Sequence, residues 1–280
     1  MMETFMKSRR KLFCEISPLT YKISVFKCRS LRRIKDMFSF NRFALKKTPD
    51  LLPVLIYSHK SLMRRKLGNT EMQLQENKVV NLSIAAPKVT GVLIAPGETF
   101  SFWKLVGSYS EKKGYKEGLT ISNGKTSRGI GGGLCQFTNL IHWLVLHAPL
   151  EIVEHHHHGG MDLFPDFGRQ IPFGTGTSVV YNYLDYRFRN NTDKIFQLIV
   201  YTTDEYLCGE LRCSDELGIK YHIKSENERF VKTDDVVYRK GEVYRECIDK
   251  LTGNIISREL IKSNCAKVMY DTSNLIVSEE

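Results

Sequence analysis

Apolar residues recur at two different spacings along the chain, and the change in spacing separates two groups of expected elements. Between residues 31 and 38 they lie at positions i, i+3, i+6 and i+7, which is typical of a helix. We expect further helices over 55–68, 75–90 and 136–147. From about residue 178 onward, apolar and polar residues alternate, as they do in strands. The pattern predicts an α+β fold: N-terminal helices and a mixed α/β core, followed by an antiparallel β-rich C-terminal region.

Shorter elements fall between these helices. The runs 92–94 and 150–153 predict short strands, and 99–103 alternates in a way that would place aromatic side chains in the core. Pro87 is expected to bend or end the helix over 75–90. The glycines between 114 and 133 predict a loop-rich region with tight backbone turns.

Composition excludes several classes of protein. Hydrophobic residues make up 42% and charged residues 26% of the 280 positions, which excludes a disordered chain or a collagen-like repeat. No run of 18 uncharged apolar residues occurs, so a conventional membrane-spanning helix is not expected. Gly129-Ile130-Gly131 and Gly174-Thr175-Gly176 lack the context of a nucleotide-binding loop.

Positive charge is concentrated at the N-terminal end. Residues 1–66 hold 17 Lys and Arg against 4 Asp and Glu, so the rest of the chain is slightly acidic although the whole carries +10. We therefore divide the chain into a basic helical segment (1–66), a core (67–213) and a β-rich C-terminal extension (214–280). The basic segment either meets an acidic surface, such as anionic lipid, nucleic acid or a teichoic-type polymer, or is solvated.

The same segment bears on where the protein acts. Residues 1–47 mix basic and apolar side chains, which fits a helix lying on an anionic membrane surface or one packed on its own domain. The basic N-terminus is not followed by the apolar region of a signal peptide, and the seven cysteines include no CxxC. We expect a cytoplasmic chain with reduced thiols, peripheral on the inner membrane face if it contacts membrane.

One cysteine lies in a context that favours reactivity. Gly131-Gly132-Gly133 comes just before Cys135, which stands at the first turn of the expected helix over 136–147. Free N–H groups and the positive end of the helix dipole favour a thiolate there and can hold an oxyanion, to which the Gln136 side chain could add a donor. The alternative is that Cys135 is a small buried apolar residue.

A cysteine nucleophile also needs a base. Four consecutive histidines, 155–158, follow one helix and one strand downstream and could return to Cys135. His142 and His147 lie about 10 and 18 Å up the helix at 1.5 Å per residue, so they are poorer candidates. Adjacent histidines rarely all reach one metal ion, and we expect neither a metal nor another cofactor.

Several motifs resemble those of the VanW family, which is named from accessory proteins of vancomycin-resistance gene clusters. The resemblance covers about residues 70–210. It is carried by the PGETFSF string at Pro96–Phe102, Gly114–Gly118, Asn123–Lys125, the GGGLCQ string at Gly131–Gln136, and Leu184–Thr192.

The resemblance implies chemistry on peptidoglycan. Some exported relatives are implicated as cysteine L,D-transpeptidases, which join peptidoglycan stems through a thioester. By that analogy Cys135 is the nucleophile and His158 the base, while Asp185 orients a histidine or caps a turn. Relatives often carry an Asp where this chain has Gly176, which would weaken the site if that Asp orients the histidine.

Two functions therefore remain open. One is Cys-dependent acyl transfer on a peptidoglycan precursor or stem peptide. The other is a non-catalytic accessory protein that binds a precursor or partner in the same groove at the inner membrane surface. No nucleic-acid partner is expected.

Overall fold

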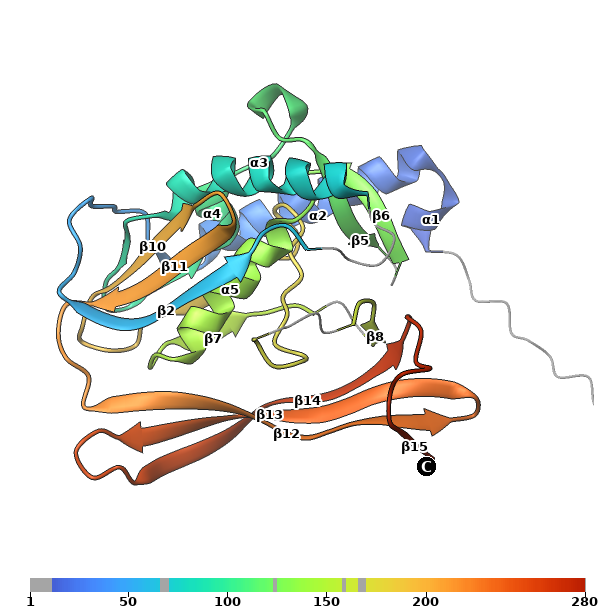
Figure 1. The fold of residues 1–280 in the computed structure, drawn as a ribbon. Helices are drawn as coiled ribbons and strands as arrows, with labels where there is room; N and C mark the ends of the chain where they lie inside the picture. Colours follow the sequence, from blue (N-terminus) through green and yellow to red (C-terminus); the bar gives the residue numbers. More distant parts are fainter. Residues whose placement is uncertain (1–11, 66–70, 123–124, 158–159, 166–169, 280) are drawn as a thin grey trace, which may run out of the picture.

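The computed structural model describes residues 12–65, 71–122, 125–157, 160–165 and 170–279. Its centre is a four-stranded antiparallel sheet in the order β2 (Val54–Leu62), β11 (Tyr206–Cys213), β10 (Phe196–Thr202) and β3 (Val92–Ile94). Helix α3 (Met72–Val89) lies over one face of this sheet and α5 (Leu134–Leu146) over the other (Figure 1). Most of the apolar core is packed between these layers.

A second sheet lies beside the first. Its order is β1 (Arg42–Phe43), β4 (Glu98–Ser101), β9 (Arg187–Arg189) and β7 (Glu151–Glu154). Short helix α4 (Phe102–Val106) follows β4, and a single 3-10 turn, η1 (Glu111–Lys113), leads to the hairpin of β5 (Glu117–Ser122) and β6 (Lys125–Ile130). Phe100 of β4 stacks on Phe188 of β9 with ring centroids 4.7 Å apart, so this sheet shares the core.

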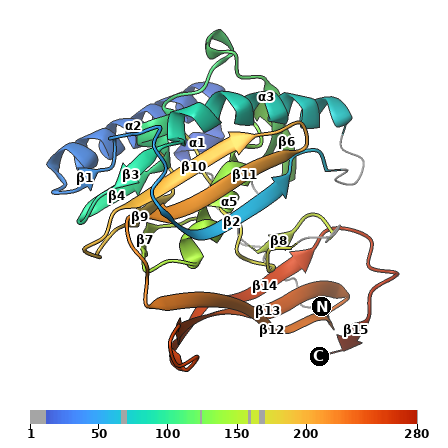
Figure 2. The same cartoon turned by 60° about the vertical axis from the view of Figure 1, so that its left-hand side comes forward.

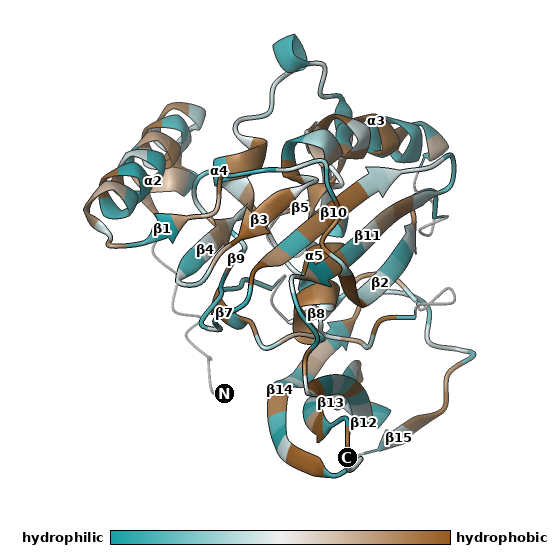
Figure 3. Cartoon of the chain, turned by 90° about the vertical axis from the view of Figure 1, so that its left-hand side faces the viewer, coloured by the Kyte–Doolittle hydropathy of each residue, from teal (hydrophilic) through white to brown (hydrophobic). Residues whose placement is uncertain are grey.

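Two helices precede the sheets. Helix α1 (Phe13–Ile16) leads into α2 (Pro18–Phe38), whose N-terminus is capped by the Ser17 side chain, with Pro at its first position. Figures 2 and 3 show α2 at the edge of the molecule, remote from the C-terminal strands. Among the helices that the structure describes, none has the length and apolar character needed to cross a bilayer.

The C-terminal residues form a curled sheet below the core (Figures 1 and 3). Three long antiparallel strands make up most of it: β12 (Ile219–Thr233), β13 (Val236–Asp249) and β14 (Ile255–Val268). Two short parallel strands close its edges, β15 (Val277–Glu279) and β8 (Met161–Asp162). The predicted α+β class, with helices early and antiparallel strands late, is confirmed.

Several predicted elements were wrong. Residues 55–68 were expected to be helical, but 54–62 form strand β2, which pairs along its whole length with β11. The expected strand near 179–183 is a turn closed by the Val180–Leu184 bridge, and the glycine-rich region contains the β5–β6 hairpin. In the first case apolar residues also occur on the exposed side of β2, at Leu55 and Leu62, so its alternation was hard to see, and Arg64 and Arg65 just beyond the strand suggested a basic helix.

Candidate functional site

The start of α5 is set by close packing of its glycines. Gly133 is the N-cap residue and has φ +95°, a conformation that other residues rarely adopt. A Cβ on Gly132 would lie 2.3 Å from the carbonyl carbon of Gly118, so the β5–β6 hairpin can approach only if both positions lack side chains. The buried Asn81 amide ties the two segments by donating to the carbonyls of Gly132 and Lys116. Cys135 is thereby held in the first turn of α5.

The surroundings of the Cys135 sulfur oppose its ionisation. Its side chain keeps some exposed surface, but burial of the sulfur raises the pKa of the thiol. The backbone N–H of Val179 donates toward the sulfur and, with the N–H of Cys135 itself, lowers the pKa by a smaller amount. The thiol in the free protein is therefore neutral, opposite to the direction expected from the helix dipole alone.

A polar stripe runs up α5 from Cys135. Asn139 and His142 follow at i+4 and i+7, on the same helix face. The loop that carries Thr177 lies along this stripe: the Thr177 N–H and hydroxyl both donate to the Asn139 side-chain oxygen, at 2.6 and 2.8 Å. Thr138 and Thr177 hydrogen-bond each other and the Cys135 carbonyl oxygen. This loop is thus fixed against the start of the helix.

Two of the four consecutive histidines meet the same loop. His155 Nε2 lies 3.1 Å from the carbonyl oxygen of Gly176, and because a carbonyl only accepts, that nitrogen carries the proton and Nδ1 is the free acceptor. The His155 ring lies 4.1 Å from that of His157 and 4.2 Å from that of His142. Burial lowers the pKa of His155 and of His157 to about 4, so both imidazoles are neutral at pH 7.

The imidazoles and the sulfur are joined through a few residues of backbone. The Gly176 carbonyl contacts His155, and the Val179 N–H contacts Cys135. Three residue steps span at most about 10 Å, which bounds the distance between these two contacts. A peptide substrate that lies along this loop could therefore reach both contacts. The structure records no hydrogen bond between Cys135 and a histidine of the described residues.

The other predicted site residues lie elsewhere. The Gln136 amide donates to the Ser61 hydroxyl and to the Leu62 carbonyl, each at 2.8 Å, at the end of β2. Asp185 is buried beside α4 and accepts from the Ser101 hydroxyl (2.5 Å) and the Trp103 N–H (3.1 Å). His158 lies outside the described residues. The structure therefore brings Cys135 close to the Gly176 loop, while Gln136 and Asp185 bind other partners.

Sequence reasoning missed Asn139 and Thr177. Asn139 could have been found from its spacing, because i+4 from a helical cysteine is on the same face. Thr177 gave no such signal, since the contact of its loop with α5 depends on the tertiary fold. Within the residues that the structure describes, no group of three His, Cys, Asp or Glu side chains could hold a metal ion.

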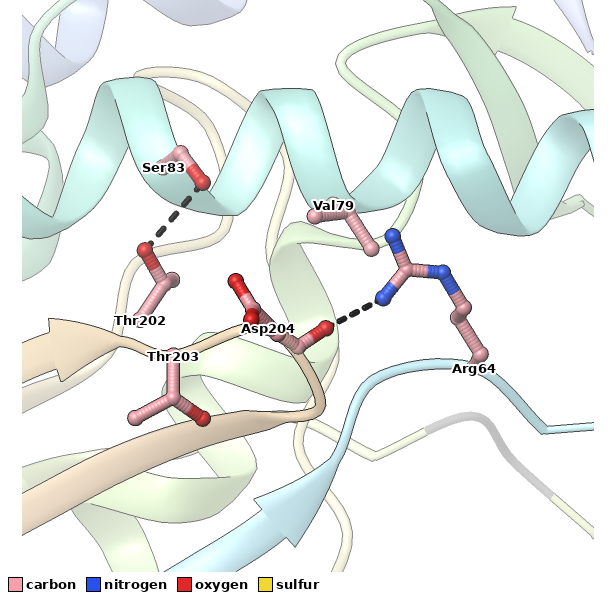
Figure 4. A pocket seen from close by; sticks show the side chains of 6 residues that line it. All are labelled: Arg64, Val79, Ser83, Thr202, Thr203 and Asp204. Atoms are coloured by element: carbon pink, nitrogen blue, oxygen red, sulfur yellow. Dashed lines mark hydrogen bonds between the residues drawn. The ribbon is translucent and has the colours of Figure 1, made fainter.

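Two cavities lie away from this site. One, of about 580 Å³, is a shallow groove between α3 and the β10–β11 turn, lined by Arg64, Val79, Ser83, Thr202, Thr203 and Asp204 (Figure 4). Its cation Arg64 is already paired with Glu76 at 2.5 Å. The other, of about 500 Å³, lies between β2, α5 and β12 and includes the stacked rings of Tyr57 and His147. Neither is lined by a predicted site residue.

Comparison with known proteins agrees with the motifs. Residues 77–212 match the family described as VanW like protein. Over 219 residues the chain is 34% identical to vancomycin B-type resistance protein VanW of Enterococcus faecalis, covering 78% of this chain and 79% of that protein. Over 113 residues it is 34% identical to uncharacterized protein YoaR of Bacillus subtilis, covering 39% of this chain and 34% of that protein. No solved structure matches. With four-fifths of a curated relative aligned and the GGGLCQ string placed at the start of α5, the chain belongs to the VanW family.

Proposed function

We propose that this chain is an accessory protein of glycopeptide resistance that carries out acyl transfer on peptidoglycan peptides through Cys135. The observation that supports it is the juxtaposition at the start of α5. The sulfur receives the Val179 N–H there, and neutral imidazoles contact the same loop at Gly176. The proposed substrate is a peptidoglycan precursor or stem peptide, met at the cytoplasmic face of the membrane.

The proposed reaction has two steps, and each requires transfer of a proton between the Cys135 thiol and an amine. Cys135 Sγ attacks a peptide carbonyl, the C–N bond breaks, and a thioester forms, while the thiol proton passes to the departing amine. An acceptor amine then attacks the thioester and returns the thiol. His155 is suited to carry the proton because its free Nδ1 can accept it, and the N–H groups of the first turn of α5 can stabilise the oxyanion.

A second function is favoured by a different observation. The raised pKa of Cys135 and the engagement of Gln136 and Asp185 with other groups suit a non-catalytic protein that binds a precursor in this groove. In that case Cys135 contributes only packing, and its replacement by alanine leaves binding in place.

Detection of a trapped thioester on Cys135 distinguishes the two proposed functions. The full chain is incubated with a synthetic stem tetrapeptide and examined by intact-mass and peptide mass spectrometry. Acyl transfer predicts a peptide adduct on Cys135 that Cys135→Ala abolishes and that replacing the exposed Cys265 by serine leaves unchanged. Binding of the peptide by both the parent and Cys135→Ala, with no adduct, supports the second function; neither adduct nor binding contradicts both.

Gly176→Asp should strengthen the base. A Cβ at Gly176 meets nothing closer than the Asn139 side-chain oxygen at 3.9 Å, so the larger residue fits. A carboxylate there is expected to raise the pKa of His155 and His157 from about 4 by about one unit or more. Thioester formation should then be about three- to tenfold faster.

NMR titration of the imidazole C2–H signals measures the first effect, and mass spectrometry the second. Gly176→Asn is the matched control, because it has the same shape without the charge. Equal imidazole pKa values in the two variants would contradict the proposed electrostatic effect.

A further inference from the structure

Helix α2 contacts the rest of the protein with its charged side. Arg32 pairs with Glu154, with 2.6 Å between Nη1 and Oε2, and also donates to the Tyr183 carbonyl. Arg29 donates to the Tyr181 carbonyl. Asp36, the only residue of α2 that is fully buried, receives two hydrogen bonds from Arg187. The helix is thus held by ion pairs and hydrogen bonds.

Its apolar side faces outward. Eight large apolar or aromatic side chains of α2 are about half exposed or more, and we single out five of them: Leu19 (67%), Ile23 (48%), Phe26 (73%), Ile34 (49%) and Met37 (71%). At 100° per residue they lie within an arc of about 80°, so they form one stripe, which we call the α2 stripe. Leu31 and Phe38 widen this exposed surface on one side of the stripe, and Phe40 extends it beyond the end of the helix. Here the usual arrangement of a surface helix is reversed, because the polar side packs on the protein.

Basic residues flank the α2 stripe. On the same helical wheel, Lys22 and Arg33 lie on one side of it and Lys27 on the other. No Asp or Glu occurs between Ser17 and Lys35. An apolar strip with cations at its borders complements a surface that has an apolar interior and an anionic rim.

We infer that α2 lies flat on an anionic lipid membrane, with the α2 stripe inserted among the acyl chains and Lys22, Lys27 and Arg33 at the headgroups. A second copy of this chain would bring two basic rims together, which disfavours self-association. A nucleic acid would pair with the cations but leave the aromatic and aliphatic side chains exposed. The inference does not depend on the chemistry of Cys135.

The docked side of α2 connects this surface to the candidate site. Glu154, which binds Arg32, directly precedes His155, and Tyr181 and Tyr183 follow the Val179 contact with Cys135. A membrane-bound α2 would therefore hold the loops around Cys135 near the lipid surface. A peptide substrate carried by a lipid would then be met close to its anchor.

Vesicle sedimentation of the full chain tests the inference. At low salt the protein should pellet with vesicles of equal parts phosphatidylglycerol and phosphatidylcholine and stay in solution with phosphatidylcholine alone. The double variant Phe26→Ser with Met37→Ser should bind at least tenfold more weakly. Replacing Lys22, Lys27 and Arg33 by glutamine should weaken binding similarly and reduce its salt dependence.

The matched control is Leu251→Ser with Ile276→Ser, which removes two side chains that are 94% and 95% exposed in the C-terminal region. It should bind as the parent does. Equal binding by the Phe26/Met37 variant and the parent would overturn the inference, as would absence of binding to anionic vesicles. A dimer in solution that the Phe26/Met37 variant dissociates would also overturn it and assign the α2 stripe to self-association.

Discussion

Arg187→Met is expected to lower the free energy of unfolding by about 3–5 kcal/mol, because it leaves buried carboxylates without their cation. The Arg187 side chain is 7% exposed and contacts Asp36 at 2.7 and 2.9 Å and Asp185 at 2.8 Å. Burial alone would raise the pKa of Asp36, yet Arg187 and Lys104 hold it below its usual value. Asp185 has the opposite balance, since burial keeps its pKa raised despite Arg187.

The loss of local stability in Arg187→Met should be largest at α2. Asp36 is the buried attachment of that helix, so Arg187→Met should increase hydrogen exchange over 18–38 more than in the central sheet. Urea denaturation gives the total effect. Arg128→Met is the control, since Arg128 pairs with Glu71 at the surface with side chains 52% and 60% exposed, and should change stability by under about 1 kcal/mol. Similar losses in both variants would contradict the assigned role of the buried network.

Mild acid is expected to destabilise the protein by about 3–5 kcal/mol between pH 7.5 and pH 5.5. Burial lowers the pKa of His147, His155 and His157 to about 4, and that of His142 further. In the unfolded chain an imidazole binds a proton near pH 6.5, while these remain neutral in the folded state until about pH 4. Stability is therefore lost as the pH falls from 6.5 toward 4, by about 1 kcal/mol for each group at pH 5.5 after allowance for solvent near the half-buried rings.

Urea denaturation at the two pH values measures this loss. The double variant His155→Gln with His157→Gln should recover about 2 kcal/mol of it. The control His222→Gln makes the same exchange at an exposed position on β12 and should retain the full loss. A stability that does not change between pH 7.5 and 5.5 would show that the four imidazoles titrate alike in both states.

Local sequence patterns were sufficient to predict a helix or strand where that element is long or has clear start and stop residues. Helix α5 was predicted because an apolar run begins after three glycines and ends before Pro149, and the helix expected over 75–90 is found as α3, which spans Met72–Val89. Strand β2 was not predicted, because its formation depends on pairing with β11, about 150 residues later in the chain. Basic side chains near its end resembled those of a solvated helix.

At the candidate site, the sequence located the cysteine without its surroundings. The GGGLCQ string placed Cys135 in the first turn of a helix, as found. The contacts of Gly176 and Val179 come from a loop some 40 residues later, and only the folded chain brings them to α5. Asp185 matched a family motif, but its partners are Ser101 at the end of β4 and Trp103 in α4.

The sequence by itself determined the family, the α+β class, the basic N-terminal segment and a cysteine at the start of an apolar helix. The tertiary structure decided the direction of the Cys135 pKa shift and the side of α2 that faces solvent. Both depend on desolvation, which is set by all the groups packed around an atom wherever they occur in the chain. Helix spacing and dipole are set by near neighbours in sequence, and therefore could be predicted from it.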